Sequence, residues 1–394
     1  MNILVLSFYY PPDLSAGSFR TKALVDALTK ATGEAGRIDV VTTLPNRYRT
    51  FVTSADNRET FGRVQVTRVA LPMHRSGMRD QALAFAVFAW KALWNLRGKQ
   101  YDLVYATSSR LFTAFLGALC SIRTKAPLYL DIRDIFVDTI NDVLPRRVAR
   151  LAMPLLKGVE CFTVTRASRI NLVSEGFRDY FHSRYPEGHY VFFTNGVDEE
   201  FVRARFDPPQ RTEEGRPTIV YAGNFGEGQG LHRIIPSLAK RLPEYDFQLV
   251  GDGGRKDALV RELEVARLTN VRVLPPVPRE RLLELYRDAV CLFLHLNDYE
   301  AFRKVLPSKI FEYAATGKPI LAGLAGYPAE FLTRHVENAA VFPPCDVEAA
   351  VRALRTLRLA PVDRSAFIER FDRGRIMNAM ASDVMALAVQ AGKL

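Results

Sequence analysis

Residues 218–230 read TIVYAGNFGEGQG, an apolar run that passes directly into a glycine-rich turn. The run at 218–221 predicts a buried strand, and the apolar spacing at 231–242 predicts the helix that follows the turn. Four glycines from Gly223 to Gly230 allow the backbone to approach a phosphate closely. Alternatively, the segment is an ordinary strand-to-helix connection, and it lacks the Gly-Lys-Ser/Thr of an NTP-hydrolysing P-loop.

The same alternation of apolar strand and helix runs through both halves of the chain. In the second half the predicted strands are 218–221, 247–250, 271–274, 290–294 and 320–322, between helices 231–242, 256–268, 279–286, 308–316 and 346–357. In the first half the predicted strands are 3–7, 38–43, 64–69, 103–106, 128–131, 170–173 and 191–193, with helices 19–29 and 82–96. Continuous apolar strands that alternate with helices predict parallel sheets covered on both faces, and hence an α/β protein.

The length of 394 residues favours two domains. Residues 205–217, RFDPPQRTEEGRP, are polar and contain three prolines, so they predict a linker between domains 1–204 and 218–373. The last segment, 374–394, lies beyond the second sheet, and one expectation is that its helix packs back on the first domain. Two doubly wound Rossmann-like domains would face a central cleft, with ligands at the carboxyl ends of the strands.

The formal net charge of +11 favours an anionic partner, which could be a nucleic acid, a phosphorylated substrate or an acidic membrane surface. No apolar run approaches the roughly 18 residues that span a bilayer, and the N-terminus resembles a strand more than a signal peptide. We therefore expect a cytoplasmic protein that can be peripheral at the inner face of the plasma membrane. The cysteines are scattered, so neither a metal site nor a disulfide is expected.

Two helical segments, 82–96 and 145–157, combine apolar and basic residues. Such helices can rest on an anionic bilayer. Alternatively, both are ordinary amphipathic helices that pack on a sheet.

The most specific signal is residues 306–320, LPSKIFEYAATGKPI. Ser308 and Lys309 lie in the first turn of the predicted helix, where unpaired N–H groups and the helix dipole attract a diphosphate. Glu312 follows about one turn later, where a carboxylate can accept both hydroxyls of a ribose. The alternative is a capping box, but such a box places its acid three residues after the serine, and Glu312 comes four residues after it.

Two further loops follow predicted strands. Gly17 and Ser18 open the first helix, where backbone N–H groups can meet an anion, although Ser18 could be only a helix cap and no GxGxxG is present. Gly251 lies in the turn VGDGG at 250–254, which is either a phosphate-binding loop or a simple tight turn.

With these segments in view, the chain resembles the family-4 retaining glycosyltransferases of GT-B fold, and most closely the bacterial branch that builds O-antigen, capsule and other surface polysaccharides. The resemblance covers nearly the whole chain. The segments that carry it are FYYPPDLSAGSFR (8–20), TTLPN (42–46), LDIRDIFVD (130–138), SEG (174–176), TNGVD (194–198), YAGN (221–224), VGDG (250–253) and PSKIFEYAATGKPI (307–320).

This resemblance implies transfer of a sugar, of N-acetylhexosamine type, from a UDP-sugar to a lipid-linked or saccharide acceptor, with retention and without a metal or other cofactor. It implies that Glu312 binds the ribose and that the backbone of Pro276 and Val277 lies near the base. The residues implied at the nucleotide sugar are Gly17, Asn224, Gln229, Gly251, Pro276, Val277, Ser308, Lys309 and Glu312. The residues implied in catalysis are Arg133, Asp134 and Lys309.

Four positions depart from the family pattern. Lys304 stands where the first of two acids is usual, Asn224 and Gln229 stand near the usual Arg and Lys, and Arg133 stands in place of a common His. The implied partners are a nucleotide-sugar donor, a polyprenyl-diphosphate-linked or saccharide acceptor and an anionic membrane surface, but not nucleic acid, because the basic residues are scattered. The alternatives are an epimerase or hydrolase of GT-B shape that acts on the donor alone, and a basic binding protein or sugar-binding homologue without catalysis.

Overall fold

The computed structural model divides the chain into two compact units. Unit 1 runs to Thr194 and resumes at Gly374, and unit 2 comprises Asn195–Arg373. The structure describes residues 1–34, 36–45, 55–71, 78–108, 111–135, 137–138, 146–206 and 215–392. Asn46 and Phe136, which belong to two of the motifs quoted above, lie outside the described residues.

The chain crosses between the units earlier than the sequence indicates. Residues 195–204, predicted to end the first domain, belong to unit 2, because Val197 and Phe201 are buried in its core. Of the predicted linker 205–217, residues 205–206 and 215–217 belong to unit 2, and residues 207–214 lie outside the described residues.

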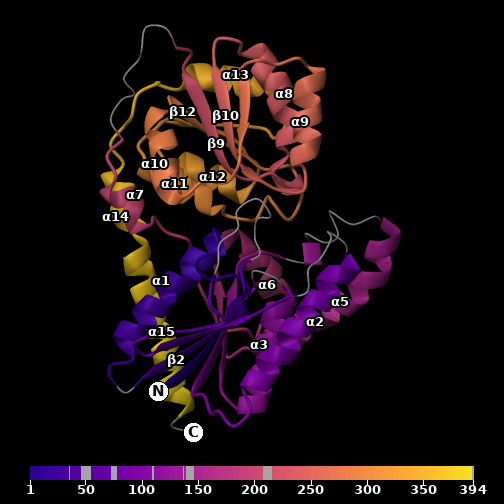
Figure 1. Cartoon of the computed structure of the whole chain (residues 1–394), viewed down its shortest axis with the longest axis vertical. Helices are drawn as coiled ribbons and strands as arrows, with labels where there is room; N and C mark the ends of the chain where they lie inside the picture. The colour runs from indigo at the N-terminus through magenta and orange to yellow at the C-terminus, as the bar shows by residue number, and fades with distance from the viewer. Residues whose placement is uncertain are drawn as a thin grey trace. The chain divides into compact units, whose positions relative to one another are not determined.

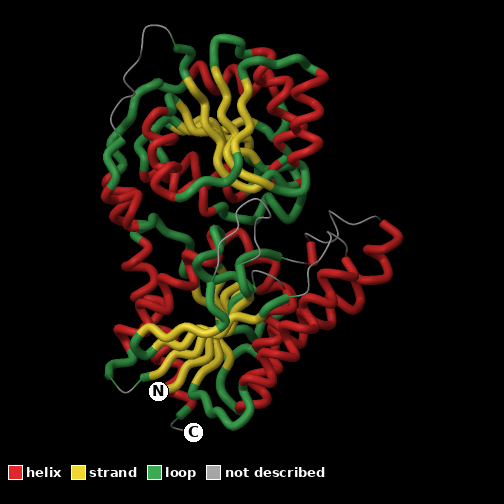
Figure 2. Tube along the Cα trace, viewed as in Figure 1, coloured by secondary structure: helices red, strands yellow, loops and turns green. Residues whose placement is uncertain are grey.

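Unit 1 is built on an eight-stranded sheet of order β3-β4-β2-β1-β5-β6-β7-β8, in which only the β3–β4 pair is antiparallel (Figures 1 and 2). Its strands are β1 (Asn2–Leu6), β2 (Arg37–Thr43), β3 (Arg58–Phe61), β4 (Val64–Val69), β5 (Leu103–Thr107), β6 (Leu128–Ile132), β7 (Arg169–Leu172) and β8 (Tyr190–Val191). The strand order reverses between β1 and β5, and such a switch point is where doubly wound sheets bind ligands.

Helices cover both faces of this sheet. Side chains of α1 and α15 pack with alternate residues of the central strands, such as Ile3, Val5 and Tyr105, in one buried cluster. The C-terminal helix α15, yellow in Figure 1, therefore lies in the core of unit 1. The helices of this unit are α1 (Ala16–Ala31), α2 (Met78–Asn95), α3 (Leu111–Thr124), α5 (Arg146–Arg166), α6 (Arg178–Arg184), α15 (Arg373–Ala391) and the 3₁₀ turn η1 (Glu175–Phe177).

Unit 2 has a six-stranded parallel sheet of order β11-β10-β9-β12-β13-β14, with its switch point between β9 and β12. The strands are β9 (Thr218–Asn224), β10 (Asp246–Asp252), β11 (Val271–Leu274), β12 (Cys291–His295), β13 (Ile320–Gly323) and β14 (Ala339–Phe342). The helices are α7 (Glu199–Arg203), η2 (Glu227–Gln229), α8 (Leu231–Arg241), α9 (Lys256–Val265), α10 (Arg279–Asp288), α11 (Ser308–Ala315), α12 (Tyr327–His335), α13 (Val347–Thr356) and α14 (Ser365–Arg370).

Successive residues of the central strands point to opposite faces, so each face of the second sheet has its own core. Val220 and Leu292 pack with α10, α11 and α12, whereas Ile219 and Cys291 pack with α8, α9 and α13. This is the arrangement that continuous apolar strands predict. The two doubly wound sheets confirm the predicted α/β class.

The two segments where the chain passes between the units, near Val197 and near Arg373, lie side by side at the ends of unit 2. The N–H of Val197 donates to the carbonyl of Phe371 at 2.8 Å, and the N–H of Arg373 donates to the carbonyl of Val197 at 3.0 Å. A Cβ at Gly196 would lie 2.7 Å from the Cα of Arg373, so only glycine allows this approach of the two segments.

Candidate functional site

The first turn of α11 offers backbone N–H groups that no side chain caps. Pro307 precedes the helix and has no side-chain donor or acceptor, and Ser308 and Lys309 form the first turn. Both are half-buried, whereas the helix behind them is fully buried. Uncapped N–H groups at the positive end of a helix dipole favour an anion such as a phosphate.

Glu312 is buried one turn later, with only 7% of its surface exposed. Its carboxylate accepts a hydrogen bond from the Lys309 ammonium at 2.7 Å, so the alternative of a capping box with Ser308 does not apply. Burial acts to raise the pKa of Glu312, but the charges of Lys309, Arg279 and Arg373 outweigh it and hold the pKa below its usual range. The group is therefore an ionised, buried hydrogen-bond acceptor.

A charged cluster behind Glu312 was not predicted from the sequence. Asp198, which precedes α7, pairs with Arg279 at the start of α10 and with Arg373 at 2.7 Å. Arg373 also donates to the carbonyl of Gly196 at 2.8 Å. Asp198 was visible as the last residue of the TNGVD motif, but its two partners are distant in sequence and no local pattern marks them.

The glycine-rich turn after β9 is close to Lys309. A Cβ at Gly223 would lie 3.6 Å from the Lys309 Cε and 2.9 Å from the Tyr221 hydroxyl, so the absence of a side chain keeps this approach open. Gly251 has a φ of +149°, and a Cβ there would lie 1.8 Å from the Gly223 carbonyl oxygen. Gly251 therefore permits the close packing of the ends of β9 and β10.

Two predicted ligands of the donor bind each other in this structure. The Asn224 amide donates to the Gln229 side-chain oxygen at 2.9 Å, and the same oxygen accepts from the Gly226 N–H at 3.2 Å. The pair fixes the shape of the turn, and both side chains are half-buried.

The base of the same turn is held by Glu227. Its carboxylate accepts from the Tyr299 hydroxyl at 2.8 Å, from Arg233 at 2.7 Å and from Arg255 at 2.6 Å. Burial opposes its ionisation, but the Tyr299 hydrogen bond and the two guanidinium groups lower its pKa.

His295 joins this turn to the sheet. It is fully buried at the end of β12, with Nδ1 at 2.7 Å from the Gln229 carbonyl and Nε2 at 2.9 Å from the Cys345 N–H. Because Nε2 must accept, Nδ1 carries the proton and the ring is neutral. Burial is the main cause that lowers its pKa to about 4.

The remaining predicted residues of unit 2 lie on two loops. Pro276 and Val277 are half-buried between β11 and α10, and they lead directly to Arg279. Lys304, in the position where the family has an acid, pairs with Glu300 at 3.0 Å.

In unit 1, Gly17 and Arg133 are in direct contact. Gly17 lies in the first turn of α1, and a Cβ there would lie 2.3 Å from the Arg133 Nη1. Asp134 instead lines a small internal space with Glu160, and no ion pair joins Arg133 to Asp134 in the part of the chain that the structure describes. The charge of Asp134 still acts on Arg133, which directly follows β6 at the carboxyl end of the sheet.

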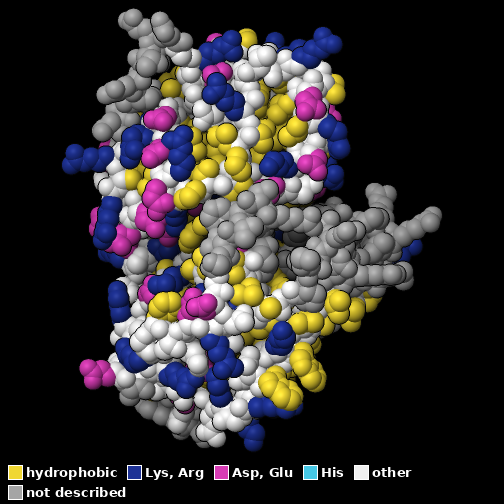
Figure 3. Space-filling model, in the orientation of Figure 1, with side chains coloured by type: hydrophobic (Ala, Val, Ile, Leu, Met, Phe, Trp, Pro, Cys, Tyr) yellow, Lys and Arg dark blue, Asp and Glu magenta, His cyan; other side chains and the backbone are white. Residues whose placement is uncertain are grey.

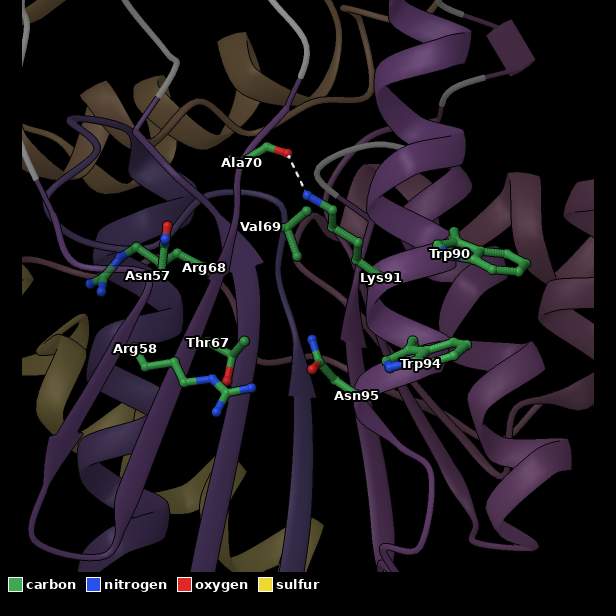
Figure 4. Close-up of a pocket in the computed structure, with 10 residues that line it drawn as sticks. All are labelled: Asn57, Arg58, Thr67, Arg68, Val69, Ala70, Trp90, Lys91, Trp94 and Asn95. Carbon is green, nitrogen blue, oxygen red and sulfur yellow. Dashed lines mark hydrogen bonds between the residues drawn. The ribbon is translucent and has the colours of Figure 1, made fainter.

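A second surface of unit 1 combines aromatic and basic side chains. Trp90 and Trp94 are 67% and 53% exposed, with stacked rings 6.2 Å apart, and the Arg97 guanidinium lies 3.5 Å from the Trp94 ring. Between α2 and strands β3 and β4 lies an open cavity of about 520 Å³, lined by both tryptophans, Lys91 and Arg58 (Figure 4). Figure 3 shows hydrophobic side chains gathered along the side of unit 1 where Figure 1 draws α2. Among the described residues, no helix combines the length and the apolar character needed to cross a membrane.

Comparison with known proteins extends this picture to the whole chain. The model of the glycosyl transferase 4-like domain matches residues 20–196, and that of glycosyl transferases group 1 matches residues 202–372. Among solved structures, Anabaena Alr3699/HepE in complex with UDP and glucose has a TM-score of 0.60 at 18% identity, over 100% of this chain and 98% of that chain. WaaG, a glycosyltransferase involved in lipopolysaccharide biosynthesis, has a TM-score of 0.58 at 13% identity, over 99% of this chain and 98% of that chain.

Two relatives are similar in sequence. The putative colanic acid biosynthesis glycosyl transferase WcaI of Escherichia coli K12 is 29% identical over 201 residues, which are 48% of this chain and 47% of that protein. The match thus spans about half the length of this relative. The 2-deoxystreptamine N-acetyl-D-glucosaminyltransferase of Niallia circulans is 22% identical over 278 residues, 68% of this chain and 69% of that protein. Since both domain models match in chain order and the solved structures share its fold, the chain belongs to the group 1 and 4-like glycosyltransferases of GT-B fold.

Proposed function

We propose that this chain transfers a sugar from a UDP-sugar to a saccharide or lipid-linked acceptor in the synthesis of a surface polysaccharide. The observation that carries the proposal is the position of Lys309 and the buried, ionised Glu312 on the first turns of α11, beside the glycine-rich turn. Lys309 supplies a positive charge for a diphosphate, and Glu312 supplies a carboxylate for a ribose.

The chemistry of each group follows from its surroundings. The Glu312 carboxylate has two oxygens and can accept both hydroxyls of a ribose, because the neighbouring positive charges keep it ionised. The Lys309 ammonium has three donors, of which one lies on Glu312 at 2.7 Å and a second, at 3.4 Å, on the Tyr286 hydroxyl. The third can reach a diphosphate at the first turn of α11, where positive charge and N–H groups stabilise the leaving nucleoside diphosphate as the glycosidic bond breaks.

The finer parts of the proposal rest on the relatives. Anabaena Alr3699/HepE binds UDP and UDP-glucose in its solved structures, which supports a uridine donor for this chain. One relative is named as an N-acetyl-D-glucosaminyltransferase, which supports an N-acetylhexosamine, and another as a colanic acid enzyme, which supports a polysaccharide acceptor. Retention of the anomeric configuration is what the family resemblance implies.

The test is transfer by the purified full chain. Labelled UDP-N-acetylhexosamines and UDP-hexoses are incubated with and without a polyprenyl-diphosphate-linked saccharide, and the product's anomeric configuration is read by NMR. Acceptor-dependent transfer that falls in Lys309→Met but not in Lys240→Ala, an exposed lysine on α8, supports the proposal. Donor turnover without an acceptor would instead indicate an epimerase or hydrolase.

We also propose that the surface formed by Trp90, Trp94, Lys91 and Arg97 rests on anionic lipid. Exposed tryptophans beside cations are typical of proteins at the headgroup level of a membrane. Liposome flotation with phosphatidylglycerol should recover the wild-type chain and lose the Trp90→Ser/Trp94→Ser variant. Val265→Ser, which removes an exposed apolar side chain of α9 (81% exposed), is the matched control and should still float. Equal flotation of all three would refute this role.

A further inference from the structure

Two buried tyrosines of unit 2 place their hydroxyl groups beside Lys309. Tyr286 on α10 and Tyr313 on α11 are both fully buried in the core cluster that these helices share with the sheet. Their rings pack edge to face, with centroids 5.4 Å apart. A phenylalanine at either position would fill the same space without burying a polar group, so packing alone does not require the two hydroxyls.

The two hydroxyls form a short chain of hydrogen bonds that ends on Lys309. The Lys309 ammonium donates to the Tyr286 hydroxyl at 3.4 Å, which is long for such a bond, and the Tyr286 hydroxyl donates to that of Tyr313. The Tyr313 hydroxyl also accepts from the backbone N–H of Ala222 on β9 at 3.1 Å. This chain thus connects the ammonium to the strand that leads into the glycine-rich turn.

The side chain of Lys309 is held by further contacts. Its ammonium donates to Glu312 at 2.7 Å and lies 6.0 Å from the centroid of the Tyr313 ring. Its Cε is close to the turn, since a Cβ at Gly223 would lie 3.6 Å from it. An ammonium has three donors, so one N–H is left for a ligand. The direction of this N–H is set by Glu312 and Tyr286, because both acceptors are buried.

The two tyrosines do not exchange protons with the site. Burial is the main cause that holds the pKa of Tyr286 well above its ordinary value, and burial raises the pKa of Tyr313 as well. Both hydroxyls therefore stay protonated, so they form hydrogen bonds but do not act as bases. What they can contribute is the position of the ammonium.

We propose that Tyr286 is a positioning residue for Lys309, and that Tyr313 orients Tyr286, so that the remaining N–H of the ammonium is directed at the diphosphate before the donor binds. A long, flexible side chain that is already ordered loses less conformational freedom when it binds a ligand, and the affinity for the ligand is higher. This inference deepens the proposed function and rests on it for the identity of the ligand.

The test is calorimetric titration of UDP into the full chain, Tyr286→Phe, Lys309→Met and the double variant. Tyr286→Phe keeps the ring and removes only the hydroxyl, and it should weaken UDP binding about 3- to 10-fold. In the Lys309→Met background the same substitution should have no further effect, because the group that it orients is gone. An equal loss of affinity in both backgrounds would show a role in packing alone. That result, or unchanged affinity in Tyr286→Phe, overturns the proposal.

Two further tyrosine variants serve as comparisons. Tyr313→Phe should weaken UDP binding less than Tyr286→Phe does, because its hydroxyl reaches Lys309 only through Tyr286. Tyr101→Phe removes a buried hydroxyl of unit 1 that donates to Asp39 at 2.7 Å, and it should leave the affinity for UDP unchanged. A loss of affinity in Tyr101→Phe as large as that in Tyr286→Phe also overturns the proposal.

A second measurement needs no ligand. Nitrogen-15 NMR relaxation reports the mobility of lysine ammonium groups, and the signal of Lys309 is the one absent from Lys309→Met. Its order parameter should fall in Tyr286→Phe and stay constant in Tyr101→Phe. An unchanged order parameter in Tyr286→Phe overturns the positioning role. If the wild-type chain binds no UDP and transfers no sugar, the proposed function fails, while the NMR comparison still decides whether Tyr286 positions Lys309.

Discussion

Glu312→Gln tests the central assignment with a side chain of the same shape. The substitution removes one negative charge and one acceptor oxygen but keeps the second oxygen in place. It also releases Lys309, which donates to this carboxylate at 2.7 Å in the ligand-free chain. The affinity for the ribose should therefore fall, while the affinity for the phosphates should stay constant or rise.

The expected magnitude follows from the hydrogen bonds that the carboxylate would make. Hydrogen bonds to a charged group contribute about 1.5–3 kcal/mol, against about 1 kcal/mol for a neutral pair. Loss of charge on one ribose contact and loss of the other contact should together cost about 2–5 kcal/mol, which is about 30-fold or more in affinity. Pyrophosphate has no ribose, so its affinity should stay constant or rise because Lys309 is released.

The dependence on pH supplies an independent check. The pKa of Glu312 in the folded chain lies below its ordinary value of 4.5, so its favourable charge is present above pH 4.5 and is lost as the pH falls through the lowered value. The free energies of unfolding of wild type and Glu312→Gln should thus differ at pH 7 and converge in acid.

The assay is calorimetric titration of UDP, uridine monophosphate and pyrophosphate into both chains. Lys309→Met provides the reciprocal case and should weaken UDP and pyrophosphate alike. The reasoning is refuted if Glu312→Gln binds UDP as tightly as wild type, or if it loses UDP and pyrophosphate to the same extent.

Three further substitutions test the framework of the two units. His295→Phe removes two hydrogen bonds to backbone groups and should cost about 2 kcal/mol at pH 7. Burial lowers the pKa of His295 from 6.5 to about 4, so the free energy of unfolding of the wild-type chain should fall as the pH drops from 6.5 towards 4. Urea titrations should show a smaller fall with pH for His295→Phe. Equal falls in the two chains would contradict this. Arg20→Leu leaves Asp131 buried without its ion-pair partner, so the free energy of unfolding measured by chemical denaturation should fall by about 3–5 kcal/mol. Adding Asp131→Asn should partly restore it. A fall below about 1 kcal/mol would disprove the role of the ion pair. Gly251→Ala places a Cβ 1.8 Å from a carbonyl oxygen and should cost about 1–3 kcal/mol, whereas Gly254→Ala, with no atom within 4 Å, should be neutral, and equal thermal midpoints would speak against it.

The sequence predicted the parts of the fold whose residues are uniformly apolar. Strands such as β1, β9 and β12 are buried on both faces, so their composition marks them without any contact information. β3 was missed because it is a mostly exposed edge strand of sequence RETF, and β14 because it is short and half-buried. Strands with a solvent-facing side carry a weaker apolar signal.

The candidate site was predictable only where one local segment contains it. Ser308, Lys309 and Glu312 share a single helix, so their spacing fixes their geometry. Arg279 and Arg373 join Asp198 from distant segments, and nothing in local periodicity records that contact.

Unit 2 is an uninterrupted stretch placed between β8 and α15, and its two ends are joined by the hydrogen bonds between Val197 and residues 371–373. A gene fragment for Asn195–Arg373 would thus encode all of unit 2 that the structure describes, with its two ends hydrogen-bonded to each other. A stop codon after Thr194 would instead delete α15, whose side chains pack on one face of the first sheet. The practical consequence for dissecting this protein is that unit 2 can be expressed as one continuous segment, whereas unit 1 must be rebuilt by joining Thr194 to Gly374.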